Sequence, residues 1–92
     1  MDFEWDRRKA EGNRRKHGVT FAEAMTVFDD RYAQTIDDPD HSDEELRWLT
    51  LGRSRLGRIL IVAHTYRGDR TRIINARKAT PTEQRTYEEN LE

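Results

Sequence analysis

Residues 58–78, RILIVAHTYRGDRTRIINARK, contain two strand patterns joined by a short turn. Residues 58–66 are rich in Ile, Leu and Val, and residues 70–78 combine β-branched side chains with arginines. Residues 46–53 form a further strand pattern, and both connections between the three strands are short and contain glycine. Because such connections join neighbouring antiparallel strands, we predict a three-stranded meander at the centre of the fold.

Two helices are predicted before these strands. Asp6 is a suitable N-cap for a helix that runs to about His17, and Gly18 suits the left-handed position that follows a helix. Thr20 and Glu23 have the spacing of a capping box for a second helix. Apolar residues at helical spacing follow as far as Phe28, so one face of this helix should be buried.

A third helix is predicted at the C-terminal end. The sequence TPTE at residues 80–83 combines an N-cap, a first-turn proline and a glutamate at N3, and Tyr87 and Leu91 are its expected buried contacts. Residues 32–36 predict a fourth strand, and residues 3–5 are either a short strand or an extended lead-in. We predict an α+β fold with two N-terminal helices, an antiparallel sheet of three to four strands and a C-terminal helix, all helices on one sheet face.

Length and composition indicate one domain, residues 1–92. The sequence lacks a run of the roughly 18 apolar residues that span a membrane, and its start lacks the apolar core of a signal peptide. We therefore predict a cytoplasmic protein without a membrane partner. The absence of cysteine excludes a disulfide framework and a zinc knuckle.

The net charge of −1 conceals strong segregation of charge. Residues 53–78 contain eight basic side chains and one acidic one, whereas residues 29–45 contain eight acidic side chains and one arginine. Arginine outnumbers lysine 14 to 3, and the guanidinium group can bind phosphate oxygens in pairs. The distribution is typical of a phosphate-binding surface, but a solvated arginine-rich surface would give the same composition.

Individual side chains in these segments have both functional and structural interpretations. Strand alternation predicts that Arg70, Arg72 and Lys78 share a sheet face and that Arg77 points the opposite way. Arg72 and Arg77 could contact phosphate or form ion pairs with acidic side chains. His64, at the end of an apolar strand, could transfer protons near neutral pH or be a hydrogen-bonded structural histidine.

The residues at the end of the first predicted helix also have a structural and a functional interpretation. His17 complements the helix dipole in the last turn, which is the interpretation we favour. Asn13 lies one turn earlier on the same face, so the two side chains could also reach a phosphate together.

The acidic residues 37–43 lack the glycine and glutamate spacing of a calcium-binding loop, so no metal site is predicted.

Several motifs occur in an order that is more specific than any one of them. They are Phe3-Glu4-Trp5-Asp6, Asn13 with Lys16-His17-Gly18-Val19, Phe21 with Phe28-Asp29-Asp30, Gly52-Arg53 with Gly57-Arg58, His64-Thr65, and the run from Arg72 to Thr80 with Glu83 and Tyr87. Over residues 2–88 this order resembles the BrnT family of ribonuclease toxins. Asn75 is a departure, since the family usually has serine there.

The resemblance implies a RelE-like fold and a metal-independent endoribonuclease that needs no cofactor and inhibits translation. It also implies neutralisation by an antitoxin with a ribbon-helix-helix DNA-binding domain. The expected complex has two toxins and two antitoxins, and it represses its own operon by contacting operator DNA through the antitoxin.

Carried over to matching positions, the resemblance implies a reactive centre formed by His64, Arg72, Arg77 and Glu83. His64 would transfer a proton, Arg72 and Arg77 would stabilise transition-state charge, and Glu83 would act as a base or only cap its helix. The residues expected to hold RNA are Lys16, Arg53, Arg70 and Lys78.

Two other classes of function are compatible with the sequence. One is a non-catalytic module that binds a charged protein partner through the segregated charge. The other is a toxin of the RelE or ParE fold that acts on a protein target, such as DNA gyrase, instead of RNA.

Overall fold

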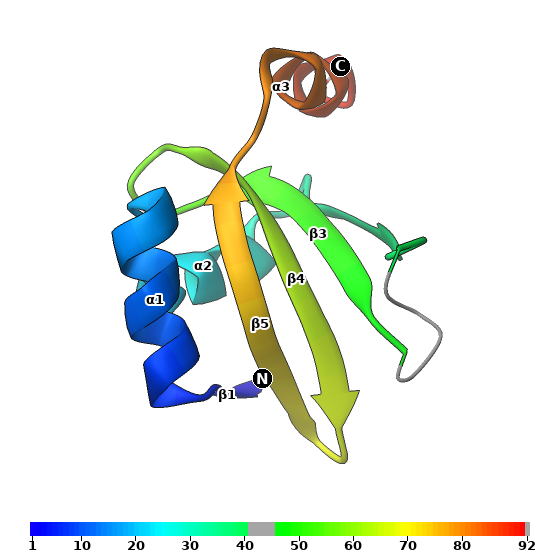
Figure 1. The fold of residues 1–92 in the computed structure, drawn as a ribbon. Helices are drawn as coiled ribbons and strands as arrows, with labels where there is room; N and C mark the ends of the chain where they lie inside the picture. Colours follow the sequence, from blue (N-terminus) through cyan, green and yellow to red (C-terminus); the bar gives the residue numbers. More distant parts are fainter. Residues whose placement is uncertain (41–45, 92) are drawn as a thin grey trace.

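The computed structural model describes residues 1–40 and 46–91, so the acidic stretch 37–43 lies partly outside the described residues. The elements, in chain order, are β1 (Asp2–Glu4), α1 (Arg7–His17), α2 (Phe21–Met25), the 3-10 helix η1 (Thr26–Asp29), β2 (Gln34–Asp37), β3 (Trp48–Arg53), β4 (Ile59–Arg67), β5 (Arg70–Lys78) and α3 (Pro81–Glu89) (Figure 1). The α+β class is therefore confirmed. No helix in the described part of the chain is long and apolar enough to cross a membrane.

The strands form one mixed sheet in the order β1-β5-β4-β3-β2. Strands β2 to β5 are the predicted antiparallel meander, but β1 adds a fifth strand that runs parallel to β5. The prediction of a purely antiparallel sheet of three to four strands is therefore wrong. A three-residue strand is too short to show the alternating pattern by which strands are recognised.

A β-bulge interrupts β5. Ala63 of β4 pairs with Asn75, whereas the next residue of β4 pairs with Ile73. Ile74 is thus an extra residue on the β5 side, which is the arrangement of a bulge. Side chains alternate along a strand. This one extra residue therefore places the side chains of residues 70–73 on the faces opposite to those expected for an uninterrupted strand.

The bulge brings two predicted site residues onto the same face. Arg72 pairs with Thr65 and Arg77 pairs with Ile61, and these β4 partners are four residues apart, so all four side chains share a face. Lys78, next to Arg77, lies on the opposite face. The prediction that Arg72 shares a face with Lys78 and is separated from Arg77 is therefore wrong, because it assumed an uninterrupted strand.

Two hydrophobic clusters lie on opposite faces of the sheet. The first joins α1 and α2 to the sheet and contains Val19, Phe21, Ala24, Val27, Leu60, Val62, Ile73 and Ala76. The second joins α3 to the other face and contains Leu51, Ile61, Ala79 and Tyr87. Figure 1 shows α3 lying across the end of the strands, away from α1 and α2. The prediction that all helices share one face is therefore wrong.

The predicted caps of α1 and α3 are confirmed. Asp6 accepts a hydrogen bond from the first turn of α1, and Gly18 follows that helix with a φ of 69°. Thr80 and Glu83 form the capping box of α3, whose Tyr87 is 1% exposed. Leu91 is 39% exposed, because α3 ends before it.

The second helix differs from its prediction in length and in its cap. It ends at Met25, and the chain continues as the 3-10 helix to Asp29. Thr20 accepts a hydrogen bond from the backbone of Glu23, as a capping box requires. The carboxylate of Glu23, however, is bound by Arg58 and Ser54, so it connects α2 to the turn between β3 and β4.

Asn13 fastens α1 to the sheet. Its side-chain amide donates to the carbonyls of Val19 and Ala76 at 2.9 and 2.8 Å, and its side-chain oxygen accepts from the Ala76 backbone at 3.0 Å. The residue is 8% exposed. Its polar atoms are therefore used by the fold, and the phosphate-binding alternative for Asn13 is not supported.

Candidate active site

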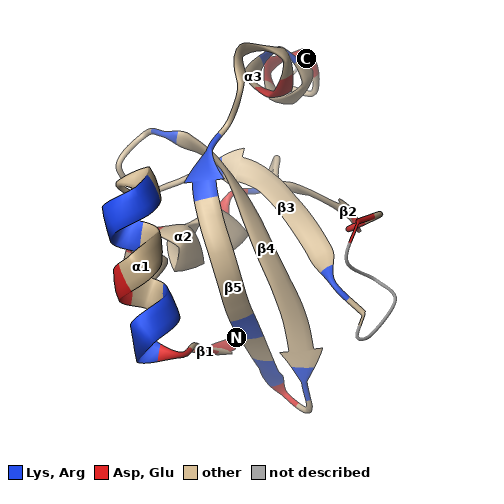
Figure 2. Ribbon diagram, viewed as in Figure 1, with Lys and Arg blue, Asp and Glu red and all other residues tan. Residues whose placement is uncertain are grey.

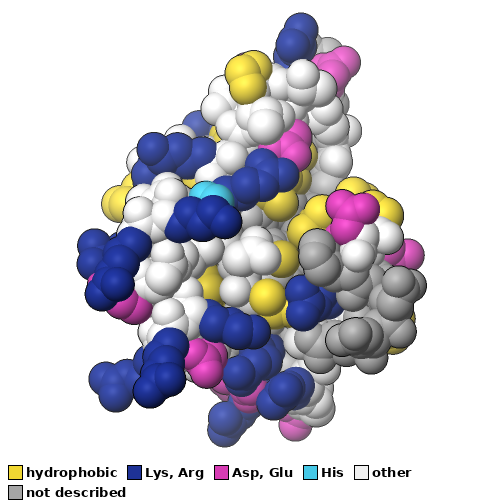
Figure 3. All heavy atoms as spheres, in the orientation of Figure 1, with side chains coloured by type: hydrophobic (Ala, Val, Ile, Leu, Met, Phe, Trp, Pro, Cys, Tyr) yellow, Lys and Arg dark blue, Asp and Glu magenta, His cyan; other side chains and the backbone are white. Residues whose placement is uncertain are grey.

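The sheet face opposite α1 and α2 carries a row of polar side chains on β4 and β5. We call it the arginine face and define it by Thr65, Arg67, Arg70, Arg72, Asn75 and Arg77. Figure 2 shows basic residues near both ends of β5 and uncharged residues between them. Figure 3 shows Lys and Arg side chains above and below this uncharged part, with hydrophobic side chains between α3 and the strands.

Three arginines surround one carboxylate at the hairpin end of this face. Glu4 of β1 lies 2.8 Å from Arg72, 3.9 Å from Arg70 and 4.0 Å from Arg67. The side chains of Arg67 and Arg70 are 59% and 63% exposed, whereas that of Arg72 is 25% exposed. Because three guanidinium groups share the Glu4 carboxylate, it does not form a close ion pair with each of them, and only Arg72 lies within hydrogen-bond distance.

Sequence reasoning missed Glu4 and Arg67 as members of this cluster. Glu4 enters because β1 pairs in parallel with β5, which places it beside Arg72. Arg67 enters because it pairs with Arg70 at the hairpin end. The hairpin register was a usable signal for Arg67, since the turn length fixes which residues face each other.

At the other end of the arginine face, Arg77 and Glu83 form a two-pronged ion pair. The guanidinium donates to the two carboxylate oxygens at 2.8 and 3.0 Å, and the Thr80 backbone donates to one of them at 2.8 Å. The bond from Arg77 is the largest cause that lowers the pKa of Glu83 to about 2. Glu83 is therefore ionised and a weak base while this pair is closed, and its structural role as a cap is confirmed.

His64 does not join the arginines. It pairs with Ile73 on the face covered by α1 and α2, and it is 0% exposed. Its Nε2 lies 2.7 Å from the Thr50 hydroxyl, and its ring packs edge-on against Phe28. Burial lowers the pKa of His64 to about 4. Proton transfer from His64 to RNA is therefore not supported, and the structural interpretation fits.

We expect burial of His64 to make stability depend on pH between about 6.5 and about 4. In this window the unfolded imidazole takes up a proton and the buried one does not, so stability is complete above pH 6.5 and falls on acidification. At pH 5 the expected loss is about 2 kcal/mol. The difference between the unfolding free energies in urea at pH 7 and at pH 5 measures this loss of stability.

The control for this prediction is His64→Leu, which keeps the other two histidines. The difference in unfolding free energy between the two pH values should be much smaller in His64→Leu than in the wild type. An equal difference would show that His64 does not cause the pH dependence.

The predicted RNA-holding residues are divided between two places. Arg53 and Lys78 line a cleft of about 450 Å³ between α3 and the turn after β3, together with Arg58. Arg70 lies at the other end of β5. Along the strand it is roughly 26 Å from Lys78, at about 3.3 Å per residue. Lys16 is exposed in the last turn of α1, outside the arginine face.

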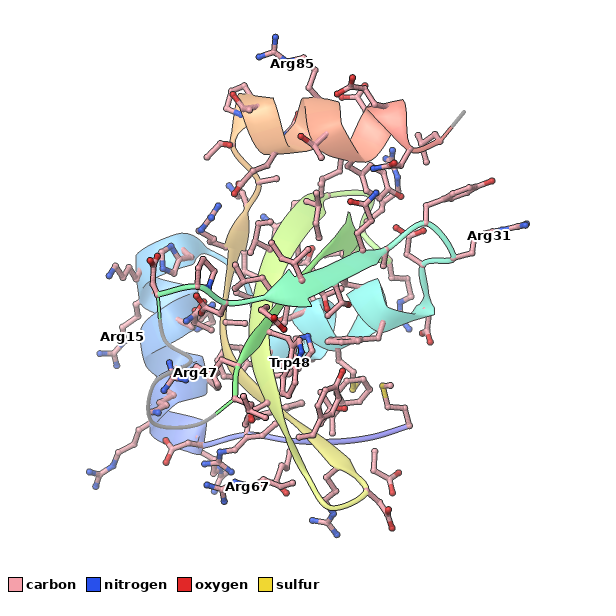
Figure 4. The ribbon with its side chains drawn as sticks, turned by 90° about the vertical axis from the view of Figure 1, so that its right-hand side faces the viewer. Arg15, Arg31, Arg47, Trp48, Arg67 and Arg85 are labelled. Carbon is pink, nitrogen blue, oxygen red and sulfur yellow. The ribbon has the colours of Figure 1, made fainter. Side chains whose placement is uncertain are left out.

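The remaining arginines are dispersed. Figure 4 shows Arg15, Arg31 and Arg85 pointing outward from separate parts of the molecule, whereas Arg67 lies at the β4–β5 turn.

Among the residues that the structure describes, no group of three or more His, Asp or Glu side chains is arranged to hold a metal ion.

Fold and site together define a small α+β protein with a cationic, phosphate-compatible sheet face. The family model described as ribonuclease toxin, BrnT, of type II toxin-antitoxin system matches residues 5–83. This match spans most of the chain, and the protein belongs to the BrnT family.

A solved structure supports the fold. The chain is similar to the crystal structure of the Brucella abortus ribonuclease toxin BrnT, with a TM-score of 0.63 and 23% sequence identity. The alignment covers 87% of this chain and 97% of the Brucella chain, so the two share their architecture over nearly their whole length. No match was found among curated proteins.

Proposed function

We propose that this chain is a metal-independent endoribonuclease of RelE-like fold that cleaves RNA in the cytoplasm and thereby inhibits translation. One observation carries the proposal beyond the family: the bulge in β5 places Arg72 and Arg77 on the same face of the sheet, with side chains that are 25% and 39% exposed. Two cations on one surface can act on the same bound strand of RNA. On opposite faces of the sheet they could not.

The reaction requires charge stabilisation at phosphorus. The ribose 2′-hydroxyl loses its proton and attacks the neighbouring phosphorus, the bond to the 5′-oxygen breaks, and that oxygen takes up a proton. The products are a 2′,3′-cyclic phosphate and a free 5′-hydroxyl. The negative charge that builds on the phosphate oxygens can be stabilised by fixed guanidinium groups in place of a metal ion. We assign this role to Arg72 and Arg77.

Both arginines are held by carboxylates when RNA is absent. Glu4 holds Arg72, and Glu83 holds Arg77, so both guanidinium groups are kept on this face until a phosphate competes for them. When Arg77 turns to a phosphate, Glu83 loses the contact that most lowers its pKa. Glu83 then becomes a stronger base next to the substrate, which is the role we assign to it.

The strand of RNA is proposed to run along β5. Arg70 would hold it at the hairpin end and Arg53 would hold it at the cleft near α3, whereas Lys78 reaches this cleft from the opposite face of the sheet, at the end of β5. Lys16 receives no part in this path, because α1 packs on the opposite face of the sheet.

The partner is proposed to be an antitoxin, because the family belongs to type II toxin–antitoxin systems. We propose that this antitoxin has a ribbon-helix-helix DNA-binding domain and that two copies of each protein form the complex. Operator DNA would then be contacted through the antitoxin.

Incubation of the purified chain with RNA in excess chelator tests the proposed activity. We expect shorter fragments that end in 2′,3′-cyclic phosphates, because the mechanism uses arginines and the RNA's own 2′-hydroxyl. RNA that stays intact over a wide range of protein concentrations would contradict the proposal, as would cleavage that requires added metal.

A further inference from the structure

Asn75 occupies the middle of the arginine face. Three successive pairs of β4 and β5 residues lie on this face, namely Thr65 with Arg72, Ala63 with Asn75, and Ile61 with Arg77. Asn75 is therefore one pair away from each of the two arginines to which charge stabilisation is assigned. Its side chain is exposed, so a strand of RNA on this face can reach it.

The spacing of the two arginines determines where a phosphate that both contact must lie. The β4 partners of Arg72 and Arg77 are four residues apart, which corresponds to about 13 Å at about 3.3 Å per residue. For both guanidinium groups to act on one phosphate, each side chain has to cover about half of this distance toward the other. The scissile phosphate then lies over the central pair, next to Asn75.

The side-chain amide of Asn75 is available to a ligand. It makes no hydrogen bond to another residue within residues 1–40 and 46–91. The other polar side chains of the three pairs have partners, because both arginines bind carboxylates and the Thr65 hydroxyl donates to the carbonyl of Leu46. A phosphate at the centre of the face thus meets an amide that has no protein contact to give up.

The β-bulge is what brings this amide onto the same face as both arginines. The extra residue, Ile74, immediately precedes Asn75. In an uninterrupted strand Asn75 would share a face with Arg77 but not with Arg72, which is three residues earlier. Bulges are frequent beside active sites, where they change the direction of a side chain.

We propose that Asn75 is a further catalytic residue, which donates a side-chain N–H to a non-bridging oxygen of the scissile phosphate. The inference rests on the proposed function, since it concerns the same phosphate. A neutral amide does not move the protons of the reaction, but its N–H groups can stabilise the negative charge that builds on the phosphate oxygens. Asn75 adds a neutral donor to the two cationic ones.

Single-turnover cleavage of a short RNA by Asn75→Ala and Asn75→Asp tests this role. The aspartate has nearly the shape of asparagine but, when ionised, has no hydrogen to donate. We expect each variant to lower the rate about 100-fold, as loss of one donor to a transition-state oxyanion does. The Kd of Asn75→Ala for RNA with methylated 2′-hydroxyls should change less than about threefold, because the donor acts mainly on charge that develops during the reaction.

Asn90→Ala is the matched control, because it removes an exposed amide from the end of α3, outside the arginine face. It should cleave at the wild-type rate, and thermal unfolding confirms that all the variants are folded. The inference is overturned if Asn75→Ala cleaves as fast as the wild type, or if Asn90→Ala loses as much activity as Asn75→Ala does.

An NMR titration with the methylated RNA distinguishes failure of this inference from failure of the proposed activity. We expect the side-chain N–H signals of Asn75 to shift when the RNA binds and those of Asn90 to stay unchanged. A wild-type protein that does not cleave RNA would contradict the proposed activity. Side-chain signals of Asn75 that stay unchanged while the RNA binds would overturn the inference itself.

Discussion

Arg72→Ala and Arg77→Ala are each expected to lower the rate of RNA cleavage about 100- to 1,000-fold, the range seen when one donor to a transition-state oxyanion is removed. The guanidinium groups share one face of the sheet, and Glu4 and Glu83 hold them there until a phosphate competes for them. Their loss leaves the charge that develops on phosphate without a fixed counter-charge. Single-turnover cleavage of a short RNA at saturating protein measures the effect on the chemical step.

Arg85→Ala is the matched control for these variants, because it removes the same charge from the outer side of α3. It should cleave at close to the wild-type rate. Arg72→Lys and Arg77→Lys should recover little activity, since lysine keeps the charge but cannot form the paired hydrogen bonds of a guanidinium. Full activity in either alanine variant would remove that arginine from the proposed mechanism.

Arg58→Met is expected to destabilise the fold by about 3 to 5 kcal/mol, the cost of leaving a buried charge without its partner. Glu23 is 7% exposed, and Arg58 donates to both of its carboxylate oxygens. The contact with Arg58 is also the largest cause that lowers the pKa of Glu23. Removal of Arg58 leaves this carboxylate buried, with Ser54 donating to it at 2.7 Å.

The double variant Glu23→Met with Arg58→Met separates the ion pair from the packing around it. Because it removes the buried charge together with its partner, it should recover much of the stability that Arg58→Met loses. Urea unfolding of the wild type and the two variants gives the comparison. A cost below about 1 kcal/mol for Arg58→Met would show that the pair contributes little.

The parts of the fold that could be predicted are those with repeated local signals. Strand β5 was predicted with its observed bounds, and the caps at Asp6, Gly18 and Thr80 were recognised because capping depends on residues close in sequence. Strand β1 is only three residues long and is positioned by its pairing with β5. Pairing between distant segments leaves no pattern within so short a strand.

The bulge explains why the site could be predicted only in part. The residue types at Arg72, Arg77 and Glu83 were read from the sequence, but alternation assigned the two arginines to opposite faces. One extra residue at Ile74 brings them together, and no local signal at Ile73-Ile74 distinguishes a bulge from a regular strand. The burial of His64 could not be predicted for a similar reason, since Phe28 and Thr50 cover it from distant parts of the chain.

The central claim is that RNA binds the arginine face. A titration of ¹⁵N-labelled protein with a short RNA whose 2′-hydroxyls are methylated, and which therefore cannot be cleaved, tests it directly by NMR. We predict that the largest shifts are at the side-chain Nε of Arg72 and Arg77 and at the Asn75 backbone amide, with little change at Asn13 on the opposite face. Shifts concentrated on α1 and α2, with those of Arg72 and Arg77 unchanged, would contradict the account.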